Sequence, residues 1–377
     1  PSESVAASAS ATPSSSATAE PTAAAVAPII TWEEPAVFNG NPTEILADGD
    51  TWVAVGGVDP RGPGAWTSSD GQTWEPAEVV DPQPDPMFPG SKLGPTVRFG
   101  DSLLSYGTFI GCCDGRGVLG WRSADGRSWE VIESRSPLFA TGYLVNELVV
   151  GDQVIVAVEG RYSTFSGRLW RWTEEASWVE TTPNTAGTDQ PSGMTTSDVT
   201  WADGRFVAVG ARGDPPGGGP VRGASWTSTD GQAWEESAAA PELEDVELLE
   251  VAPVPGGGYV ALGISDAANF GNDSATVALT SPDGLAWTPA QMPSMGPLTR
   301  PIDVITVDEG LVAIGSTTES EGSSTTVWTS ADGATWTDDS HTDGWPVAIA
   351  AMGDQLVLIT TDSTLAEHTF HRGTLSR

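Results

Sequence analysis

The sequence predicts an all-β protein, a seven-bladed β-propeller whose blades are antiparallel sheets of four strands. Two observations carry this prediction. A motif with two tryptophans around an Asp-Gly pair recurs about every fifty residues, and a short apolar run precedes each copy. Fixed periods of roughly 20–50 residues are typical of repeat architectures such as propellers. No stretch of the 377 residues has a convincing helical spacing of apolar residues.

Each copy of the motif predicts two short strands joined by a tight turn. Asp-Gly between apolar or aromatic residues is a strong hairpin signal, because glycine adopts positive φ without steric cost. The aspartate and the serine before it can accept hydrogen bonds from backbone N–H groups of the turn. Because a chain needs one active site rather than one per repeat, the recurrence assigns these aspartates to structure. They are Asp70, Asp125, Asp230, Asp283 and Asp332, with Glu174 in a degraded sixth copy.

The apolar runs predict buried strands, and counting them gives seven blades. The last run, residues 356–360, is not followed by an Asp-Gly turn, so residues 345–377 supply only three strands. Residues 29–33 resemble the strand that follows each turn. We therefore expect this N-terminal strand to complete the seventh blade, which would remove both open sheet edges.

Two regions are predicted, a disordered tether over residues 1–28 and the propeller over residues 29–377. Residues 1–28 consist of Pro, Ser, Ala, Thr, Glu and Val, and such a composition cannot bury enough apolar surface to fold. This leader is typical of a secreted protein, or of a lipoprotein anchored through an N-terminal Cys that has been removed. We expect an extracellular or cell-surface location and no transmembrane segment.

The charge is strongly acidic, with 51 Asp and Glu against 16 Lys and Arg and a formal net charge of −35. A field of this sign argues against nucleic acid and against anionic membrane surfaces as partners. It serves solubility, or it suits a cation-rich environment. The three histidines have no metal-ligand spacing, and no phosphate-binding glycine loop is evident. We therefore predict neither a metal nor another cofactor.

The two cysteines, Cys112 and Cys113, are adjacent. Neighbouring Cα atoms lie about 3.8 Å apart, below the usual disulfide range, so a disulfide between them would be strained. A vicinal disulfide, a pair of free thiols and an intermolecular bond all remain open.

A ligand is expected on one face of the ring. The turns between first and second strands and between third and fourth strands are short, whereas the connections on the opposite face are long and dissimilar. Variable loops on a rigid frame commonly bind ligands. Arginine there suits an anionic group and tyrosine suits a sugar ring, although the arginines could instead pair with loop acids such as Asp59 and Asp114. The predicted ligand-binding residues are Arg61, Arg116, Arg161, Tyr162, Arg168 and Arg222.

The pattern Ser-x-Asp-Gly-x-Thr-Trp, complete at residues 68–74 and 330–336, resembles the Asp-box repeat. That repeat occurs in the propellers of sialidases, sortilin-type receptors, photosystem assembly factors and some xyloglucan hydrolases. The resemblance implies a propeller over residues 29–377 in which the motif is structural. The Arg-Ile-Pro signature of sialidases is absent, and Arg300-Pro301-Ile302 has the wrong order. No catalytic residue is therefore carried over.

Together these features favour a non-catalytic, exported propeller that binds an envelope protein or a glycan through its long-loop face. The alternative is a carbohydrate-active enzyme, a sialidase-like hydrolase or lyase acting on an anionic glycan. Two carboxylates in the axial pocket would favour the enzyme. A shallow rim of mixed charge would favour the binding protein.

Overall fold

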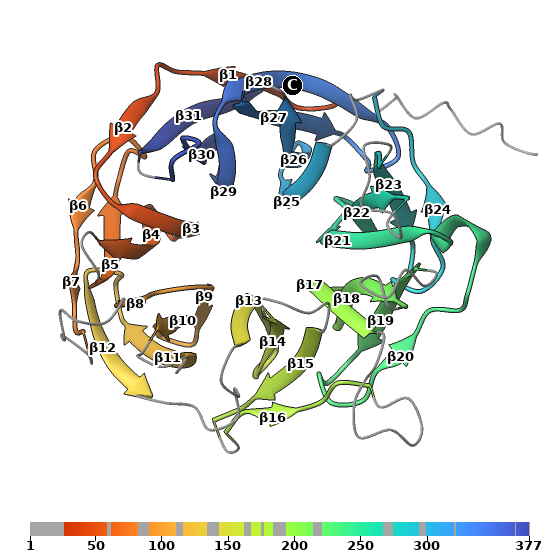
Figure 1. Ribbon diagram of the computed structural model, residues 1–377, viewed down its shortest axis with the longest axis horizontal. Coiled ribbons are helices and arrows are strands. Elements are labelled where there is room, and N and C mark those ends of the chain that lie inside the picture. Colours follow the sequence, from red (N-terminus) through yellow and green to blue (C-terminus); the bar gives the residue numbers. More distant parts are fainter. Residues whose placement is uncertain are drawn as a thin grey trace, which may run out of the picture.

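The computed structural model describes residues 26–376, apart from residues 59–61, 82–89, 111–115, 134–142, 162–166, 175–176, 184–193, 214–220, 267–273, 294–298, 320–321 and 366. Seven antiparallel sheets form a ring around a central opening (Figure 1). The predicted seven-bladed propeller is confirmed. Within the described residues the only helical element is the short 3-10 turn η2 (Pro241–Leu243). None of the described segments is a helix long and apolar enough to span a bilayer.

The blades repeat one strand order from the axis outward. The innermost strands are β3 (Asn41–Asp48), β9 (Thr96–Phe99), β13 (Tyr143–Gly151), β17 (Met194–Ala202), β21 (Val246–Pro253), β25 (Thr299–Val307) and β29 (Trp345–Met352). The second strands are β4 (Thr51–Val58), β10 (Ser102–Ile110), β14 (Val154–Arg161), β18 (Arg205–Arg212), β22 (Tyr259–Ser265), β26 (Gly310–Glu319) and β30 (Gln355–Thr361).

The outer half of each blade contains the third and fourth strands. The third strands are β5 (Gly62–Ser68), β11 (Arg116–Ser123), β15 (Gly167–Trp172), β19 (Arg222–Ser228), β23 (Thr276–Ser281), β27 (Gly322–Ser330) and β31 (His368–Ser376). The fourth strands are β6 (Glu75–Pro76), β12 (Ser128–Glu133), β16 (Val179–Glu180), β20 (Glu235–Glu236), β24 (Thr288–Pro289), β28 (Trp336–Asp343) and, for the seventh blade, β1 (Ile29–Trp32).

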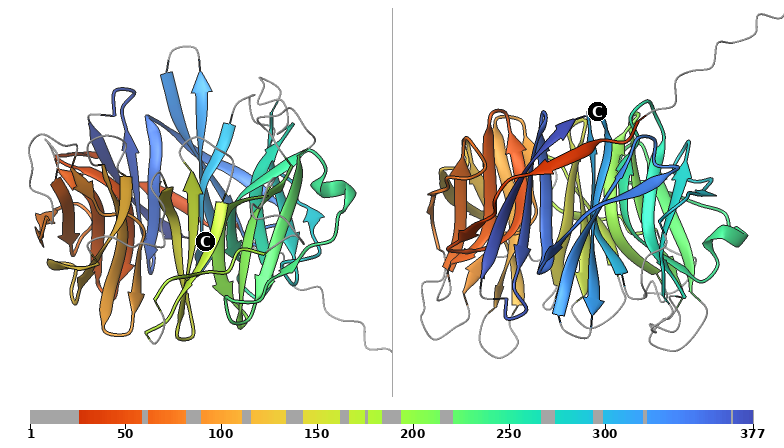
Figure 2. Two further views of the ribbon diagram at one scale, coloured as in Figure 1. Left: turned by 60° about the horizontal axis from the view of Figure 1, so that its bottom comes forward. Right: turned by 90° about the horizontal axis from the view of Figure 1, so that it is seen from above.

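The N-terminal strand closes the ring, as predicted. β1 lies beside β31 and pairs with it antiparallel (Figure 2). In this pairing Ile30 lies opposite Leu375. The next strand, β2 (Ala36–Phe38), continues along the same edge of β31. Trp32 Nε1 donates a hydrogen bond of 2.9 Å to Ser340 Oγ in β28, the outer strand of the sixth blade. The seventh blade is thus completed by residues from opposite ends of the ordered chain.

The second blade departs from the predicted pattern. Its inner edge is divided between β8 (Ser91–Lys92) and β9, both of which pair with β10. On its outer side β7 (Glu78–Val79) pairs in parallel with β12. The parallel pairing carries the connecting segment across the outer edges of two neighbouring blades.

In five of the blades an Asp-Gly turn stabilises the blade and packs against the preceding blade. Ser68 Oγ accepts a hydrogen bond of 2.9 Å from the Gly71 N–H, and Asp70 Oδ1 accepts bonds from the N–H groups of Gln72 (2.9 Å) and Thr73 (2.7 Å). These backbone donors hold the pKa of Asp70 at about 2. The same bonds recur in the turns around Asp230, Asp283 and Asp332, and part of the set recurs at Asp125.

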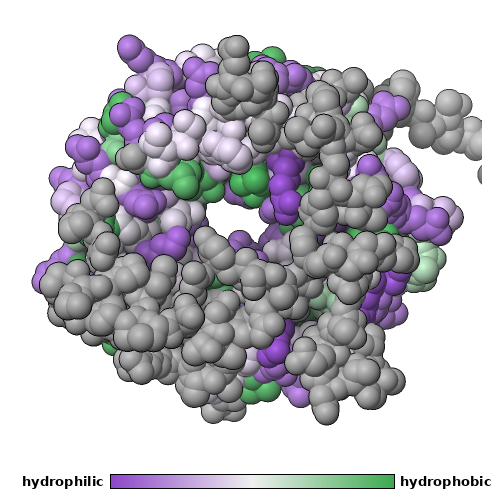
Figure 3. All heavy atoms as spheres, viewed as in Figure 1, coloured by the Kyte–Doolittle hydropathy of each residue, from purple (hydrophilic) through white to green (hydrophobic). Residues whose placement is uncertain are grey.

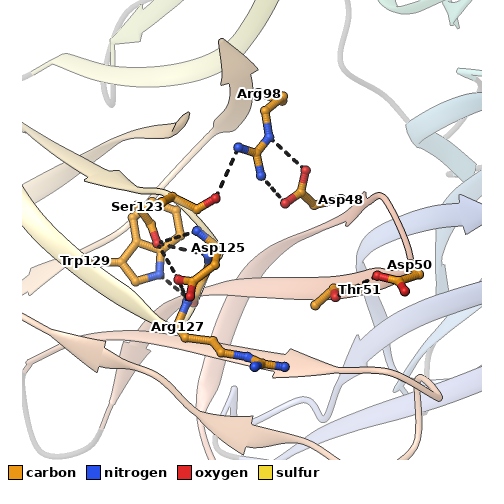
Figure 4. A network of polar contacts seen from close by, with 10 residues as sticks. Asp48, Asp50, Thr51, Arg98, Ser123, Asp125, Arg127 and Trp129 are labelled. Atoms are coloured by element: carbon orange, nitrogen blue, oxygen red, sulfur yellow. Dashed lines mark hydrogen bonds and ion pairs between the residues drawn. The ribbon is translucent and has the colours of Figure 1, made fainter. Parts of the chain in front are cut away.

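The glycine of each turn packs against a valine of the preceding blade. Gly126 has φ +76°, and a Cβ atom added there would lie 2.9 Å from Val53 Cγ2 in the first blade. The turns of the first, fourth, fifth and sixth blades repeat this contact. A polar contact adds to it, because Arg98 of the second blade pairs with Asp48 of the first, beside the turn that holds Ser123 and Asp125 (Figure 4). The sheets therefore interlock through their turns as well as through the hydrophobic clusters between them.

Candidate functional site

A cavity of 780 Å³ lies on the axis of the ring, lined mainly by the innermost strands. The space-filling view shows the opening passing through the centre of the molecule (Figure 3). Apolar atoms border it beside β29, and strongly hydrophilic atoms border it beside β25. The cavity is large enough to hold a small-molecule or oligosaccharide ligand.

In six of the seven blades a β-bulge in the innermost strand aims one residue into this cavity. In β3 the pairing with β4 skips Thr43, so that Glu44 lies opposite Val55. The innermost strands of five other blades have a bulge at the equivalent place. Bulges commonly redirect side chains in this way. The residues that follow the bulges and line the cavity are Glu44, Glu147, Asp198, Glu250, Asp303 and Ala348, while Pro95 occupies the corresponding place in the second blade.

We call Glu44, Glu147, Asp198, Glu250 and Asp303 the carboxylate ring. Three of its members also join neighbouring blades, because each accepts a hydrogen bond from a backbone N–H group of the next blade. The bonds are Thr96 N to Glu44 Oε1 (3.2 Å), Val251 N to Asp198 Oδ2 (2.7 Å) and Ile349 N to Asp303 Oδ2 (3.4 Å). The carboxylate ring therefore has a structural role at the axis, and its five acids line one cavity.

The enclosed position raises the pKa of every member of the carboxylate ring, because burial disfavours a charged carboxylate. Burial raises the pKa of Glu44 to about 8, although the N–H of Thr96 opposes the shift. Burial raises the pKa of Asp303 only to about 6, since the N–H groups of Ile349 and Val304 stabilise its charged form. The pKa values of Glu147, Asp198 and Glu250 are also raised, first by burial and then by the charges of other ring members.

The carboxylate ring is interrupted at the second blade by Pro95 and at the seventh blade by Ala348, and we call the interruption at Ala348 the gap. This gap lies between Asp303 of the sixth blade and Glu44 of the first. Val347 and Ala348 give the cavity an apolar wall there. The charge of Asp303 contributes to the raised pKa of Glu44, so the two carboxyl groups interact across the gap. Glu44 Oε2 is buried and has no hydrogen-bond partner among the described residues.

A second layer of side chains lies three residues before the carboxylate ring and Pro95, on the innermost strands and, in the second blade, on β8. Its members that line the cavity are Lys92, Leu144, Thr195, Glu247 and Arg300, which we call the mouth layer. Because the innermost strands begin on the face of the long connections, this layer lies nearer that face than the carboxylate ring does. The mouth layer has a different residue in each of these blades.

Two glycines on the second strands let the mouth layer approach closely. A Cβ atom at Gly107 would collide with the backbone oxygen of Lys92, and one at Gly263 would collide with that of Glu247. The apolar runs of most blades end in glycine at this place. Close backbone approach, rather than a special turn, explains this glycine.

The predicted ligand-binding residues fall in three groups. Arg168 pairs with Glu180 (3.1 Å) and Arg222 with Glu236 (3.2 Å), in each case joining the third and fourth strands of one blade. Neither arginine is among the residues that line the cavity. Arg116 and Arg161 lie in β11 and β14 with side chains outside the described part. Arg61, Tyr162, Cys112 and Cys113 lie outside the described residues altogether. Ligand binding by these residues stays a prediction.

Sequence reasoning missed the carboxylate ring and the mouth layer, although a signal was present. Each ring position lies about eight residues before the apolar run of its own blade. Aligning the repeats on those runs would have brought the acids into one column, in five of the seven blades. Nothing in the described residues groups three acidic, histidine or cysteine side chains closely enough to hold a metal ion.

No family model and no curated protein matches the chain. Solved structures do resemble it. A polysaccharide lyase named Uly1 aligns with a TM-score of 0.58 and 10% identity over 89% of this chain and 90% of the lyase. A 6-phosphogluconolactonase described as putative, from Bacteroides uniformis, aligns with a TM-score of 0.54 and 11% identity over 84% of this chain and 94% of its own. At these identities the similarity establishes the shared propeller fold.

Proposed function

We propose that the protein is a carbohydrate-active enzyme that hydrolyses a glycosidic bond in the axial cavity. One observation carries this proposal: two interacting carboxyl groups, Glu44 and Asp303, border an apolar gap in that cavity and have pKa values of about 8 and about 6. At about pH 7 the first is mostly protonated and the second mostly ionised. A pair of carboxyl groups held in opposite protonation states is what general acid and base catalysis of glycoside hydrolysis requires.

The roles follow from these protonation states. Glu44 donates its proton to the glycosidic oxygen as the bond to the leaving sugar breaks. Asp303 accepts a proton from the water molecule whose oxygen bonds to the anomeric carbon. One water is consumed, and each product sugar gains a hydroxyl group at the cleaved position. The apolar wall of Val347 and Ala348 gives a sugar ring a surface between the two groups.

A second candidate is non-catalytic binding of a glycan in the same cavity. The observation that favours it is the recurrence of the carboxylate in five blades, with three members bonded to the next blade. A residue type that recurs around the ring is expected to stabilise the fold, whereas general acid and base catalysis needs only two carboxyl groups. The second blade also lacks the acid, because Pro95 lies between Glu44 and Glu147. The enzyme is supported by the pair at Ala348, since the pKa values of Glu44 and Asp303 lie on opposite sides of 7.

The experiment is a screen of glycosides and polysaccharides with detection of reducing ends, at about pH 7 where the two groups differ in protonation. We expect turnover of at least one substrate, lost in Glu44→Gln and in Asp303→Asn. The matched control is Glu130→Gln, an exposed carboxylate on β12 that pairs with Arg122 outside the cavity. Binding of a glycan to the wild type without turnover would establish the second candidate instead.

A further inference from the structure

Glu247 is the most deeply buried carboxylate that lines the axial cavity. It lies on β21, its exposed fraction is 4%, and it belongs to the mouth layer. Its Oε2 atom has no hydrogen-bond partner among the described residues. A buried polar atom without a partner is destabilising, so such an atom in a cavity wall points to a donor supplied by a ligand.

The neighbours of Glu247 do not satisfy this oxygen. Arg300 on the next blade is close enough for its charge to oppose the effect of burial on the pKa of Glu247. Arg300 is nevertheless exposed, and no ion pair joins the two side chains in the part of the chain that the structure describes. A small cationic donor can therefore reach Glu247 from the cavity.

The charge of the cavity favours a cation over an anion. Glu247 and the five acids of the carboxylate ring face the cavity, whereas Lys92 and Arg300 are its only cationic lining residues in the described part. The six acids outnumber the two cations, and the Arg300 side chain is exposed and therefore screened by solvent. A bound positive charge would stabilise the ionised form of these acids, which burial disfavours. A bound carboxylate or sulfate would destabilise that form further.

We infer that the glycan taken by this cavity carries a protonated amino group, and that Glu247 binds this group at the mouth layer. The inference rests on the proposed function and deepens it, because it names the substrate class. An ammonium group fits a single carboxylate oxygen and needs no preformed set of ligands. A metal ion needs several ligands, and the described residues offer no such group.

The test uses calorimetric binding of three oligosaccharide sets of equal length at roughly pH 6, where amines are protonated. The sets are glucosamine oligomers, N-acetylglucosamine oligomers and galacturonic acid oligomers. We expect the glucosamine oligomers to bind at least about tenfold more tightly than the N-acetylated ones, as one charge-assisted hydrogen bond allows. Equal affinity for the first two sets, or preference for the galacturonic acid oligomers, would overturn the inference.

Substitutions test whether Glu247 is responsible for the preference for glucosamine oligomers over N-acetylglucosamine oligomers. Glu247→Gln should lose it, whereas Glu244→Gln, an exposed carboxylate on the same segment outside the cavity, should keep it. An unchanged preference in Glu247→Gln contradicts the inference. Should Glu247→Gln fail to fold, Arg300→Gln gives a second test, since removing this competing cation should tighten binding of the glucosamine oligomers about threefold or more. Weaker binding in Arg300→Gln would count against the inference.

Binding and turnover separate the two proposals. Amino-sugar binding that depends on Glu247, without any cleavage, would support the inference and overturn the hydrolase. Cleavage of a neutral or anionic glycan that depends on Glu44 and Asp303, without a preference for amino sugars, would support the hydrolase and overturn the inference.

Discussion

The two layers of the axial cavity differ in how they use the repeat. The carboxylate ring has the same chemistry in five of seven blades, and hydrogen bonds tie three of its members to the next blade. The mouth layer, three residues earlier in the sequence, has a lysine, a leucine, a threonine, a glutamate and an arginine. The repeated acids support the ring structure, and we expect the residues that differ between blades to determine which ligand the cavity binds. The gap at Ala348 interrupts the repeated layer.

The largest effect should come from the pair beside the gap. Glu44→Gln and Asp303→Asn should each lower kcat by about 10²–10⁴-fold, because each removes one proton transfer. Asp198→Asn, a ring member away from the gap, should lower kcat by less than about tenfold. Steady-state kinetics on the best glycan measures all three. An equal loss in Asp198→Asn would show that the gap confers no distinct role.

A loss of stability should follow when a side chain is added to the glycine of an Asp-Gly turn, where the turn packs against the preceding blade. Gly126→Ala should destabilise the fold by about 2–4 kcal/mol, because alanine is strained at φ +76° and its Cβ would press on Val53. Gly100, which has φ +56° and open space around it, provides the control. Gly100→Ala should cost about 1 kcal/mol from backbone strain alone. Denaturant unfolding measures both losses in the free energy of unfolding. Equal losses in the two variants would show that the contact between the turn and Val53 does not stabilise the fold.

Neutralising a ring acid away from the gap should stabilise the protein. Glu147→Gln removes a carboxylate whose pKa is raised by burial and by neighbouring charges, so at about pH 8 we expect a gain of about 1–3 kcal/mol. Glu130→Gln on the exposed outer strand should change stability by less than about 0.5 kcal/mol. If chemical denaturation shows that Glu147→Gln destabilises the fold, the Glu147 carboxylate is stabilised by other groups in the cavity and contributes to the stability of the fold.

Stability should also fall as the pH rises through the titration range of the carboxylate ring. In the unfolded chain these carboxyl groups lose their protons near pH 4, whereas Asp303 and Glu44 retain theirs up to about pH 6 and about pH 8. The folded state therefore binds more protons over this interval, and the free energy of unfolding decreases with pH. The turn aspartates, with pKa values below the usual range, lose their stabilising effect only on stronger acidification.

Thermal unfolding tests the predicted direction in which stability changes with pH. The melting temperature should rise by several degrees between about pH 8 and about pH 5, and the rise should be smaller in Glu147→Gln. A melting temperature that falls over this interval would mean that the ring acids are ionised and paired in the folded state.

The fold could be predicted from the sequence because its determinants are local and repeated. Asp70 and the equivalent aspartates of the other Asp-Gly turns predict the hairpins that contain them. The apolar run at residues 356–360 has no such turn after it, which predicts that the N-terminal strand completes this blade. The parallel pairing of β7 with β12 could not be predicted, since it depends on contacts between blades.

The site could not be predicted because its residues meet only after the ring closes. Glu44 and Asp303 are far apart in sequence, and only the circular order of the blades places them on either side of Ala348. The bulge that turns Glu44 into the cavity also shifts the strand register, so simple alternation of polar and apolar residues does not reveal it. The arginines singled out from the loops drew attention to the outer rim instead. Arg168 and Arg222 have glutamate partners there.

The pH dependence of kcat/KM on the best glycan tests the central claim most directly. The account predicts a bell-shaped profile with limbs near pH 6 and near pH 8, set by Asp303 and Glu44 respectively, and loss of the alkaline limb in Glu44→Gln. A profile whose alkaline limb persists unchanged in Glu44→Gln would contradict the assignment of the axial carboxyl groups as the acid and base.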